Sequence, residues 1–216
     1  MKYRAIIFDL DGTLLDTLED IADSMNSMLS HYGFPEHDLD SYRYFVGEGV
    51  EMLVRRSLPE DKLDKGFIDQ CISKMKEEYG KRWANKTRPY PGIPAMLDAL
   101  TRRGILMAVL SNKPEEFTKL VIASLLPQWH FHIVLGSGAS YPKKPDPTAA
   151  LMVAQTVKIP PQEFLFLGDS STDMKTAVNA GMHPVGALWG FRTADELTAS
   201  GAQALLEHPG DLLKLL

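Results

Sequence analysis

Short apolar runs alternate with helical patterns along most of this chain. Four clear runs and a fifth, weaker one predict buried strands: Ala5–Phe8, Leu106–Leu110, Ile133–Leu135, Phe164–Leu167 and Pro184–Leu188. Strands that alternate with helices favour a parallel sheet covered by helices on both faces. We therefore expect an α/β fold, a doubly wound parallel sheet, whose site lies at the carboxyl ends of the strands.

The segment between the first two runs breaks this alternation and predicts helices only. One amphipathic helix is indicated by apolar residues at i, i+3, i+4 and i+7 spacing, namely Leu18, Ile21, Ala22, Met25 and Leu29. Thr17, with Asp20 three residues later, predicts a capping box at the start of this helix. A second stripe, typical of a packed helix face, consists of Leu63, Phe67, Cys71, Met75 and Tyr79. We expect residues 17–88 to form a helical domain inserted into a core made of residues 1–16 and 89–216.

Two carboxylates follow the first apolar run. Asp9 and Asp11 are two residues apart, and Gly12 permits the sharp turn that would bring both into one site. A strand end with ordinary turn residues is the alternative. Because burying a carboxylate is costly without a cation or a reaction that uses it, the pair favours a functional site.

Two further acids follow the run Phe164–Leu167. Asp169 comes directly after its closing glycine, and Asp173 lies where the first turn of a helix favours negative charge. Two like charges about 4 Å apart repel by roughly 4 kcal/mol at an effective dielectric constant of 20. Acids gathered at one sheet edge therefore favour a divalent cation, for which their oxygens are suitable ligands.

Hydrogen-bond donors and cations follow the middle runs. Ser111 and Asn112 precede Pro114, which suits the first turn of a helix, so their donors could bind a phosphate. Simple helix capping is the alternative for this pair. Lys143 and Lys144 offer two positive charges further along, with solvated surface lysines as the alternative.

The segment Asp9–Thr13 resembles the first of four motifs of the haloacid dehalogenase-like (HAD) hydrolases, a superfamily dominated by magnesium-dependent phosphatases. Ser111, Lys144 and Asp169 match the second, third and fourth motifs. Lys144 is preferred to Lys143 because it directly precedes a proline, as in the family pattern. The resemblance implies a Rossmann-like core with a helical cap between the first two motifs, where the predicted helical segment lies.

The resemblance also implies roles for these residues. Asp9 would be the nucleophile that forms an aspartyl-phosphate, and Asp11 would protonate the leaving alkoxide and later activate water. The implied Mg²⁺ ligands are the Asp9 carboxylate, the Asp11 backbone carbonyl, Asp169 and, through water, Asp173. The implied phosphate-binding residues are Ser111, Asn112, Lys144 and Thr13, the last of which would also order the turn.

Asp11 argues against dehalogenation, because a halide leaves without a proton. Beyond the four motifs, the chain resembles phosphoglycolate phosphatases in Phe45–Gly49, Arg88–Gly92 and Trp189–Arg192. This implies a Mg²⁺-dependent phosphatase for a small phosphorylated metabolite, with phosphoglycolate as the leading candidate. A sugar phosphomutase of the same superfamily is the first alternative, and a non-catalytic regulatory binding protein is the second.

The predicted cap carries a glycine-rich loop that could reach the substrate. Gly47 and Glu48 are its candidate contacts, although a carboxylate at Glu48 would repel phosphoglycolate. The loop acid would then have to point away or pair with Arg43 or Arg55. A solvated loop acid is the alternative for Glu48.

Composition limits the class of protein and its partners. The net charge of −5 argues against nucleic acid, and no apolar run reaches the roughly 18 residues that span a bilayer. The single cysteine, Cys71, forms no intrachain disulfide and fits a reducing compartment. We expect a cytoplasmic monomer or homodimer that acts on a small phosphorylated metabolite. A P-loop and a complete dinucleotide fingerprint are both absent from the sequence.

Overall fold

The computed structural model describes residues 2–138 and 140–216, and its centre is a parallel sheet with strand order β5-β4-β1-β6-β7-β8. The strands are β1 (Ala5–Phe8), β4 (Leu106–Pro114), β5 (Ile133–Ser137), β6 (Phe164–Gly168), β7 (His183–Ala187) and β8 (Ala204–Leu206). All five predicted strands are therefore present. The sequence missed β8, because three residues are too few to show a pattern.

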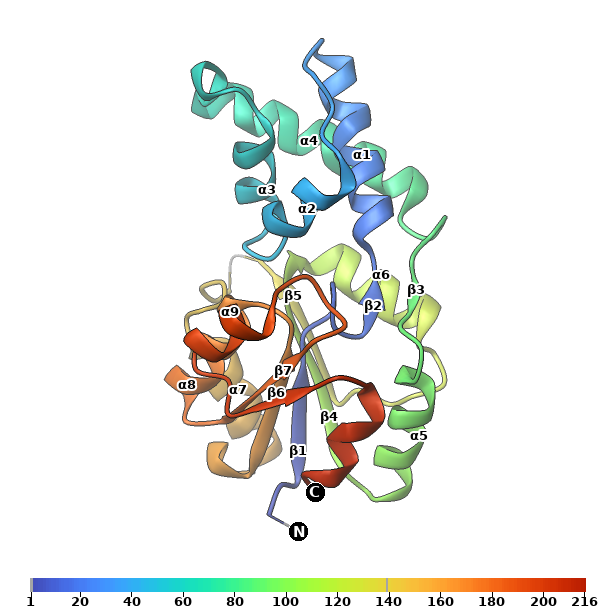
Figure 1. Ribbon diagram of the computed structural model, residues 1–216, viewed down its shortest axis with the longest axis vertical. Coiled ribbons are helices and arrows are strands. Elements are labelled where there is room, and N and C mark those ends of the chain that lie inside the picture. The colour runs from blue at the N-terminus through green and yellow to red at the C-terminus, as the bar shows by residue number, and fades with distance from the viewer. Residues whose placement is uncertain (1, 139) are drawn as a thin grey trace.

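Apolar side chains on both faces of the sheet explain why helices cover both. Ile6 and Phe8 on one face pack with α5 (Ile93–Arg102) and α6 (Glu115–Leu125). Ala5 and Ile7 on the other face pack with α7 (Thr148–Val157) and α8 (Ser171–Ala180). The remaining core elements are α9 (Ala194–Ala199), η2 (Pro161–Glu163) and η3 (Pro209–Lys214). This confirms the doubly wound α/β fold (Figure 1).

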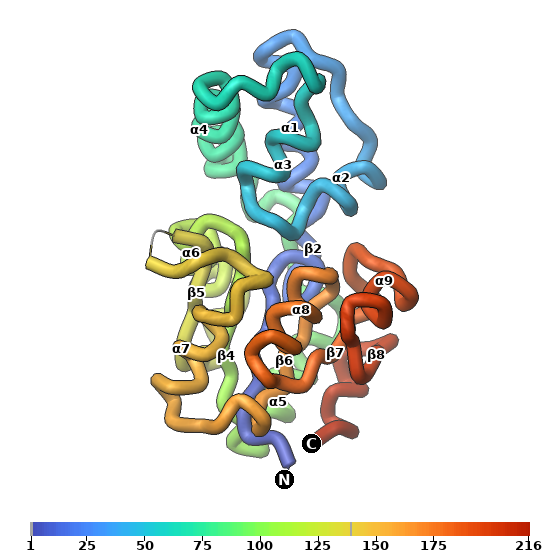
Figure 2. Tube along the Cα trace, turned by 90° about the vertical axis from the view of Figure 1, so that its left-hand side faces the viewer, coloured from blue at the N-terminus to red at the C-terminus, as the bar shows by residue number. Residues whose placement is uncertain are grey.

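The order of the strands places a candidate site next to β1. The chain runs from β1 to β4 and β5 on one side of it, and then to β6, β7 and β8 on the other. Open α/β sheets bind ligands at the carboxyl ends of the strands where the winding reverses in this way. That edge of the sheet faces the helical lobe, and both chain termini lie at the opposite edge (Figure 2).

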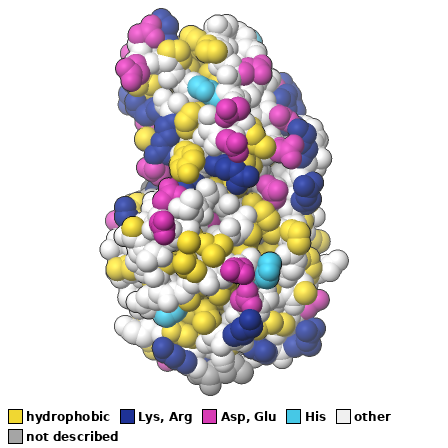
Figure 3. Space-filling model, viewed as in Figure 1, with side chains coloured by type: hydrophobic (Ala, Val, Ile, Leu, Met, Phe, Trp, Pro, Cys, Tyr) yellow, Lys and Arg dark blue, Asp and Glu magenta, His cyan; other side chains and the backbone are white. Residues whose placement is uncertain are grey.

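Four helices form the second lobe above the sheet. They are α1 (Leu18–His31), α2 (Leu39–Phe45), α3 (Val50–Ser57) and α4 (Lys65–Arg82), with the short η1 (Glu60–Lys62) before α4. Their buried residues form an apolar cluster of their own, which Phe191 joins from the core. We propose, as the sequence predicts, that residues 17–88 are a cap domain, and this separate cluster supports the proposal. Figure 3 shows charges of both signs dispersed over this lobe and an indentation where it meets the core.

Two very short strands join the lobes and were not expected from the sequence. β2 (Leu15–Asp16) and β3 (Arg88–Pro89) pair antiparallel, with Asp16 opposite Arg88. They lie on the two connections between core and helices. Strands of two residues carry no alternation of polar and apolar positions, so no pattern in the sequence predicts them.

The predicted capping box at the start of α1 is wrong. Thr17 is the N-cap residue, but its side chain makes no capping hydrogen bond. The buried Asp20 carboxylate instead accepts hydrogen bonds from the Thr87 backbone N–H at 2.8 Å, the Thr87 hydroxyl at 2.7 Å and the Lys86 backbone N–H at 3.0 Å. The Asp20 carboxylate thus bonds to residues 66 and 67 positions away and not to the backbone at the start of α1. These bonds join α1 to the connection that leads from the helical lobe back to the core.

Two smaller expectations also need correction. Leu63 precedes α4 and is 38% exposed, whereas Cys71, Met75 and Tyr79 of the same stripe are buried. Pro114 is the residue before α6 and belongs to the end of β4, so it is not in the first turn of a helix.

Candidate active site

The carboxyl ends of β1, β4 and β6 bring the predicted site residues to one edge of the sheet. Asp9 follows β1 directly, Ser111 lies near the end of β4, and Asp169 follows β6. The chain turns after Asp9 through Gly12, whose φ of 84° favours glycine. A side chain at Gly12 would also collide with Asp169, because its Cβ would lie 2.3 Å from the Asp169 Oδ2.

Three buried carboxylates converge at this edge. Asp9, Asp169 and Asp173 each offer an oxygen within 4.8 Å of the others. The Lys144 ammonium lies among them, 2.8 Å from Asp9 Oδ1 and 2.6 Å from Asp173 Oδ1. Asp173 also accepts hydrogen bonds from the Ser170 backbone and hydroxyl, so it caps α8 as well as facing the site. Lys143 is exposed, which favours Lys144 as the lysine of the site.

Two segments far apart in sequence orient Asp169. The Thr13 hydroxyl donates to its Oδ1 at 3.0 Å, and the Phe191 backbone N–H donates to its Oδ2 at 2.8 Å. A Cβ at Gly190 would lie 2.2 Å from the Asp169 Cβ, so only glycine fits beside this carboxylate. Thr13, predicted in the phosphate-binding set, is thus bonded to a candidate metal ligand.

The single positive charge of Lys144 does not balance the three carboxylates, so the cluster suits an additional cation. Burial and the neighbouring Asp173 raise the pKa of Asp9 well above its usual value, even though Lys144 opposes the shift. Burial and Asp173 likewise raise the pKa of Asp169 to about 7. Three buried acids against one buried lysine leave an excess of negative charge, and their oxygens are the donors that hard divalent cations prefer. The cluster could therefore bind a metal ion.

Asp11 points away from the acid cluster and pairs with a lysine that the sequence left unassigned. The Lys113 ammonium lies 2.8 Å from Asp11 Oδ1, and both side chains are largely buried. Burial opposes the charge of Lys113, but Asp11 and Tyr79 outweigh burial and raise the pKa of the ammonium above its usual value. The Asp11 side chain lines the same pocket as Asp9, while the metal prediction uses only the backbone carbonyl of Asp11.

Asn112, near the end of β4, joins two loops by hydrogen bonds within the protein. Its amide nitrogen donates to Gly47 O at 3.1 Å and to Lys144 O at 3.0 Å. Its amide oxygen accepts from the Lys144 backbone N–H at 2.9 Å. The side chain predicted to bind phosphate therefore orients Lys144 and the glycine-rich loop, while its role toward phosphate stays a prediction. Ser111 is buried beside it and accepts from the Lys113 backbone N–H at 3.2 Å.

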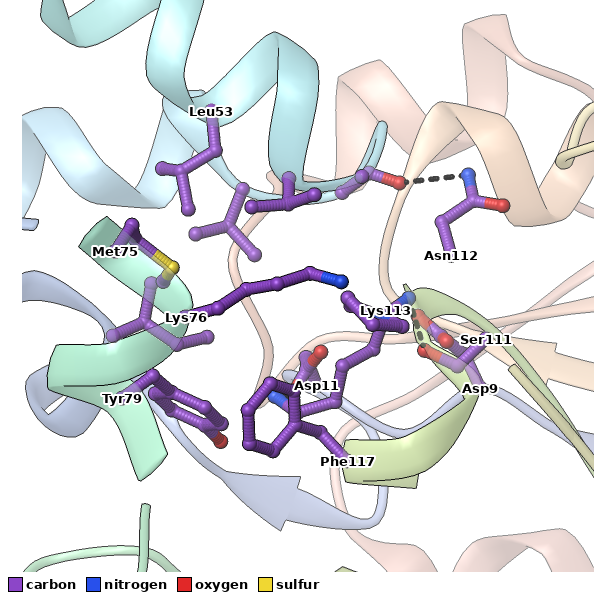
Figure 4. A pocket seen from close by; sticks show the side chains of 16 residues that line it. Asp9, Asp11, Leu53, Met75, Lys76, Tyr79, Ser111, Asn112, Lys113 and Phe117 are labelled. Carbon is purple, nitrogen blue, oxygen red and sulfur yellow. Dashed lines mark hydrogen bonds and ion pairs between the residues drawn. The ribbon is translucent and has the colours of Figure 1, made fainter. Parts of the chain in front are cut away.

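A cavity lies between this edge of the sheet and the helical lobe. The core contributes Asp9, Asp11, Ser111, Asn112, Lys113, Pro114 and Phe117, and the helical lobe contributes Ile21, Val46, Gly47, Gly49, Val50, Leu53, Met75, Lys76 and Tyr79. Figure 4 shows Met75, Lys76 and Tyr79 on one wall and Asp11, Ser111 and Lys113 on the other. Polar groups thus gather on the core side, while the cap side is mainly apolar.

The glycine-rich loop meets the cavity through its glycines. Gly47 and Gly49 line it, with φ values of 126° and 90°. Glu48 is not among the lining residues, and its carboxylate pairs with Arg56. Of the two arrangements expected from the sequence, Glu48 thus has the one outside the cavity lining, and its partner is Arg56 and not Arg43 or Arg55. A role for Glu48 toward substrate stays a prediction. Arg43 pairs with Asp40 and Arg55 with Glu51.

Sequence reasoning missed two residues at the centre of the cavity. Lys113 stands directly after Asn112, and this adjacency was the signal available. Tyr79 belongs to the apolar stripe of α4 and looked like an ordinary core residue. Lys76, on the same helix, reaches across the mouth of the cavity to Glu116 of α6, with 3.0 Å between the charged groups.

Comparisons with known proteins agree with this geometry. The family model described as haloacid dehalogenase-like hydrolase matches residues 6–187. A phosphoglycolate phosphatase of Pseudomonas putida is 33% identical over 217 residues, which cover 99% of this chain and 78% of that protein. A phosphoglycolate phosphatase of Aquifex aeolicus is 33% identical over 213 residues, which cover 99% of this chain and 96% of that protein.

Solved structures share the whole fold. A structure from Haemophilus somnus, described as a predicted phosphoglycolate phosphatase, has a TM-score of 0.92 and 27% identity, covering 100% of this chain and 98% of that chain. A haloacid dehalogenase-like family protein from Streptococcus pneumoniae has a TM-score of 0.88 at 22% identity, covering 99% and 98%, and supports the fold alone. With the family model spanning most of its length and relatives one-third identical throughout, this chain belongs to the haloacid dehalogenase-like hydrolases.

Proposed function

We propose that this protein is a phosphatase that hydrolyses a small phosphate monoester through an aspartyl-phosphate on Asp9. The observation that carries the proposal is the position of Asp9, which opens onto the cavity and lies 2.8 Å from the buried Lys144 ammonium. A carboxylate placed between a cation and a ligand cavity can act as a nucleophile toward phosphorus. The family and the names of the relatives support the same reaction.

The two steps exchange one phosphorus–oxygen bond for another. In the first step the Asp9 oxygen bonds to phosphorus, the ester bond breaks, and Asp11 donates a proton to the leaving alkoxide. In the second step water attacks the aspartyl-phosphate, Asp11 takes the proton, and Asp9 is restored. Lys144 and Ser111 would stabilise charge on the phosphoryl oxygens in both steps.

Asp9, Asp169, Asp173 and the Asp11 backbone carbonyl are the groups that would hold a Mg²⁺ ion. When bound, the ion would neutralise negative charge shared between the acids and the phosphate. Magnesium is proposed over other divalent cations because an all-oxygen donor set beside a phosphate suits it.

We propose phosphoglycolate as the substrate. The relatives from Pseudomonas putida and Aquifex aeolicus carry that name, and both align with nearly all of this chain. We further propose a cytoplasmic monomer or homodimer that binds no nucleic acid, which its net charge of −5 and single cysteine support. Among the described residues, no helix is both long and apolar enough to cross a membrane.

Phosphate release from a panel of phosphate monoesters, with Mg²⁺ and with a chelator, tests the proposal. The wild type should release phosphate only with the metal. Asp9→Asn should lower the rate by about three orders of magnitude or more while the circular dichroism spectrum stays that of the wild type. Near-normal turnover by this variant would contradict the proposal, and isomerised product with a bisphosphate requirement would indicate a phosphomutase.

A further inference from the structure

The Tyr79 hydroxyl is a buried polar group without a partner. Tyr79 is 2% exposed and lines the cavity, and its hydroxyl has no hydrogen-bond partner among the residues that the structure describes. A buried hydroxyl without a hydrogen bond is unfavourable, so native proteins rarely leave one in that state. A phenol is protonated at neutral pH and can donate a hydrogen bond. Burial raises the pKa of Tyr79 further, although the Lys113 ammonium opposes the shift.

The Lys113 ammonium lies over the Tyr79 ring and has N–H donors beyond the one that Asp11 accepts. It sits 4.5 Å from the centre of the Tyr79 ring and bonds to Asp11 at 2.8 Å. An ammonium has three N–H donors, and the Asp11 carboxylate takes one of them. Figure 4 shows the Lys113 side chain extending between Asp11 and Tyr79 at the floor of the cavity.

Much of the remaining cavity lining near the helical lobe is apolar. Val50, Leu53, Met75 and Phe117 line the same cavity with apolar surface, and the Lys76 ammonium, which also lines it, is paired with Glu116. Charge-assisted hydrogen bonds are stronger in such surroundings than in water. Asp11 already offsets the positive charge of Lys113. Lys113 and Tyr79 together therefore suit a ligand group with one negative charge better than a second phosphate dianion.

We propose that Tyr79 and Lys113 form a leaving-group subsite that selects phosphate monoesters whose leaving group carries a carboxylate. Each side chain donates one hydrogen bond to that carboxylate, while the phosphoryl group is held at Asp9. This inference rests on the proposed phosphatase function and adds the residues that choose among its substrates.

The test compares two substrates that differ only in the group the subsite would bind. Phosphoglycolate carries a carboxylate where 2-hydroxyethyl phosphate carries a neutral hydroxymethyl group. The measured quantity is the ratio of their kcat/KM values, in which any loss common to both substrates cancels. The variants are Tyr79→Phe and Lys113→Met, with Tyr32→Phe and Lys119→Met as matched controls outside the cavity.

The wild type should prefer phosphoglycolate, and Tyr79→Phe should lower that preference about tenfold, as expected for a lost hydrogen bond to a charged group. Lys113→Met should lower it about 100-fold, while the controls leave it unchanged. Tyr79→Phe should melt no lower than the wild type, since it removes only an unpartnered hydroxyl.

Two outcomes separate failure of the subsite from failure of the function. Equal losses for both substrates in Tyr79→Phe, or an unchanged ratio, would overturn the subsite and leave the phosphatase proposal standing. The Tyr79→Phe result decides this even if Lys113→Met does not fold. Phosphate release from neither substrate by the wild type would overturn the proposed function and the subsite with it.

Discussion

Lys144 holds together a site that negative charge alone would push apart. Its ammonium contacts both Asp9 and Asp173, and all three side chains are buried. Removing one partner of a buried ion pair costs about 3–5 kcal/mol because the remaining charge is uncompensated. Lys144→Met should therefore lower the free energy of unfolding by about that amount at neutral pH without metal, and should abolish phosphate release.

Urea denaturation and a phosphate-release assay check this prediction, with the exposed neighbour Lys143 as control. Lys143→Met should change the free energy of unfolding by less than about 0.5 kcal/mol, as is usual for exposed sites. Similar effects of the two substitutions would contradict the role given to Lys144.

At the residue scale, the sequence identifies groups whose position in the chain is itself unusual. Asp9 and Asp169 follow apolar runs, where an acid has few structural explanations. Both belong to the cluster of buried carboxylates at the edge of the sheet. Tyr79 and Lys113 resemble a core aromatic residue and a surface lysine. Their meeting depends on how α4 packs over the end of β4, which no local pattern encodes.

Helix α4 carries a buried acid that should make its stability sensitive to pH. Glu78 accepts hydrogen bonds from Lys81 and Arg82 at 2.8 and 2.7 Å and from Ser27 of α1 at 3.0 Å. The Lys81 and Lys74 ammonium groups are the main causes that lower the pKa of Glu78 to about 2. A carboxyl group with a lowered pKa contributes stability above its unfolded pKa and loses it as pH falls toward the folded value.

Glu78→Gln should therefore destabilise the protein by about 1–3 kcal/mol at pH 7. The difference from the wild type should shrink as pH falls from about 4.5 toward 2, where the wild-type carboxyl also becomes neutral. Chemical denaturation across this pH range measures it. Glu51→Gln, at an exposed pair with Arg55, should cost less than about 1 kcal/mol, and an equal cost at both positions would refute the argument.

At the element scale, whether the sequence predicts a strand or helix depends on how many residues that element has. The five predicted strands and the amphipathic helix from Leu18 have enough residues for a periodic pattern, and the structure contains them. β2, β3 and β8 are two or three residues long and were missed. The capping box failed for another reason, because Thr87 offers Asp20 stronger partners from across the fold than the local backbone does.

A divalent cation should stabilise the whole molecule, since three buried acids face one lysine. Burial and Asp173 raise the pKa of Asp169 to about 7. A carboxyl group with a raised pKa costs stability as pH rises from its unfolded value toward its folded one, so this cost is complete above about pH 7. A ligand at 100 times its Kd adds about 2.7 kcal/mol.

Mg²⁺ should therefore raise Tm, more at pH 8 than at pH 5.5, where protons compete for the same oxygens. Thermal melts with Mg²⁺ or with chelator measure the shift, and Asp169→Asn should reduce it. A Tm that is independent of Mg²⁺ at pH 8 would contradict a metal site at these acids.

Polar contacts join the cap to the core, beside the apolar contacts that Phe191 and Phe117 make with the cap cluster. Arg192, from the loop after β7, donates hydrogen bonds to the carbonyl oxygens of Arg43 and Val46 at the end of α2, the second at 3.1 Å. Helix C-termini leave carbonyl groups unpaired and carry partial negative charge, which a guanidinium satisfies. The preceding residue, Phe191, donates to Asp169, so one short segment bonds both to the cap and to a candidate metal ligand.

Arg192→Ala should therefore loosen the cap without unfolding either lobe, because each lobe has an apolar cluster of its own. We expect a larger radius of gyration by small-angle scattering, faster proteolysis of the connection around residues 83–88, and a kcat/KM about tenfold lower, as the loss of a charged hydrogen bond implies. Arg55→Ala, in α3 where Arg55 pairs with Glu51, is the matched control and should change none of these. If Arg192→Ala kept the wild-type radius and proteolysis pattern, contacts other than Arg192 would have to fix the cap, with Asn112 to Gly47 the first to examine.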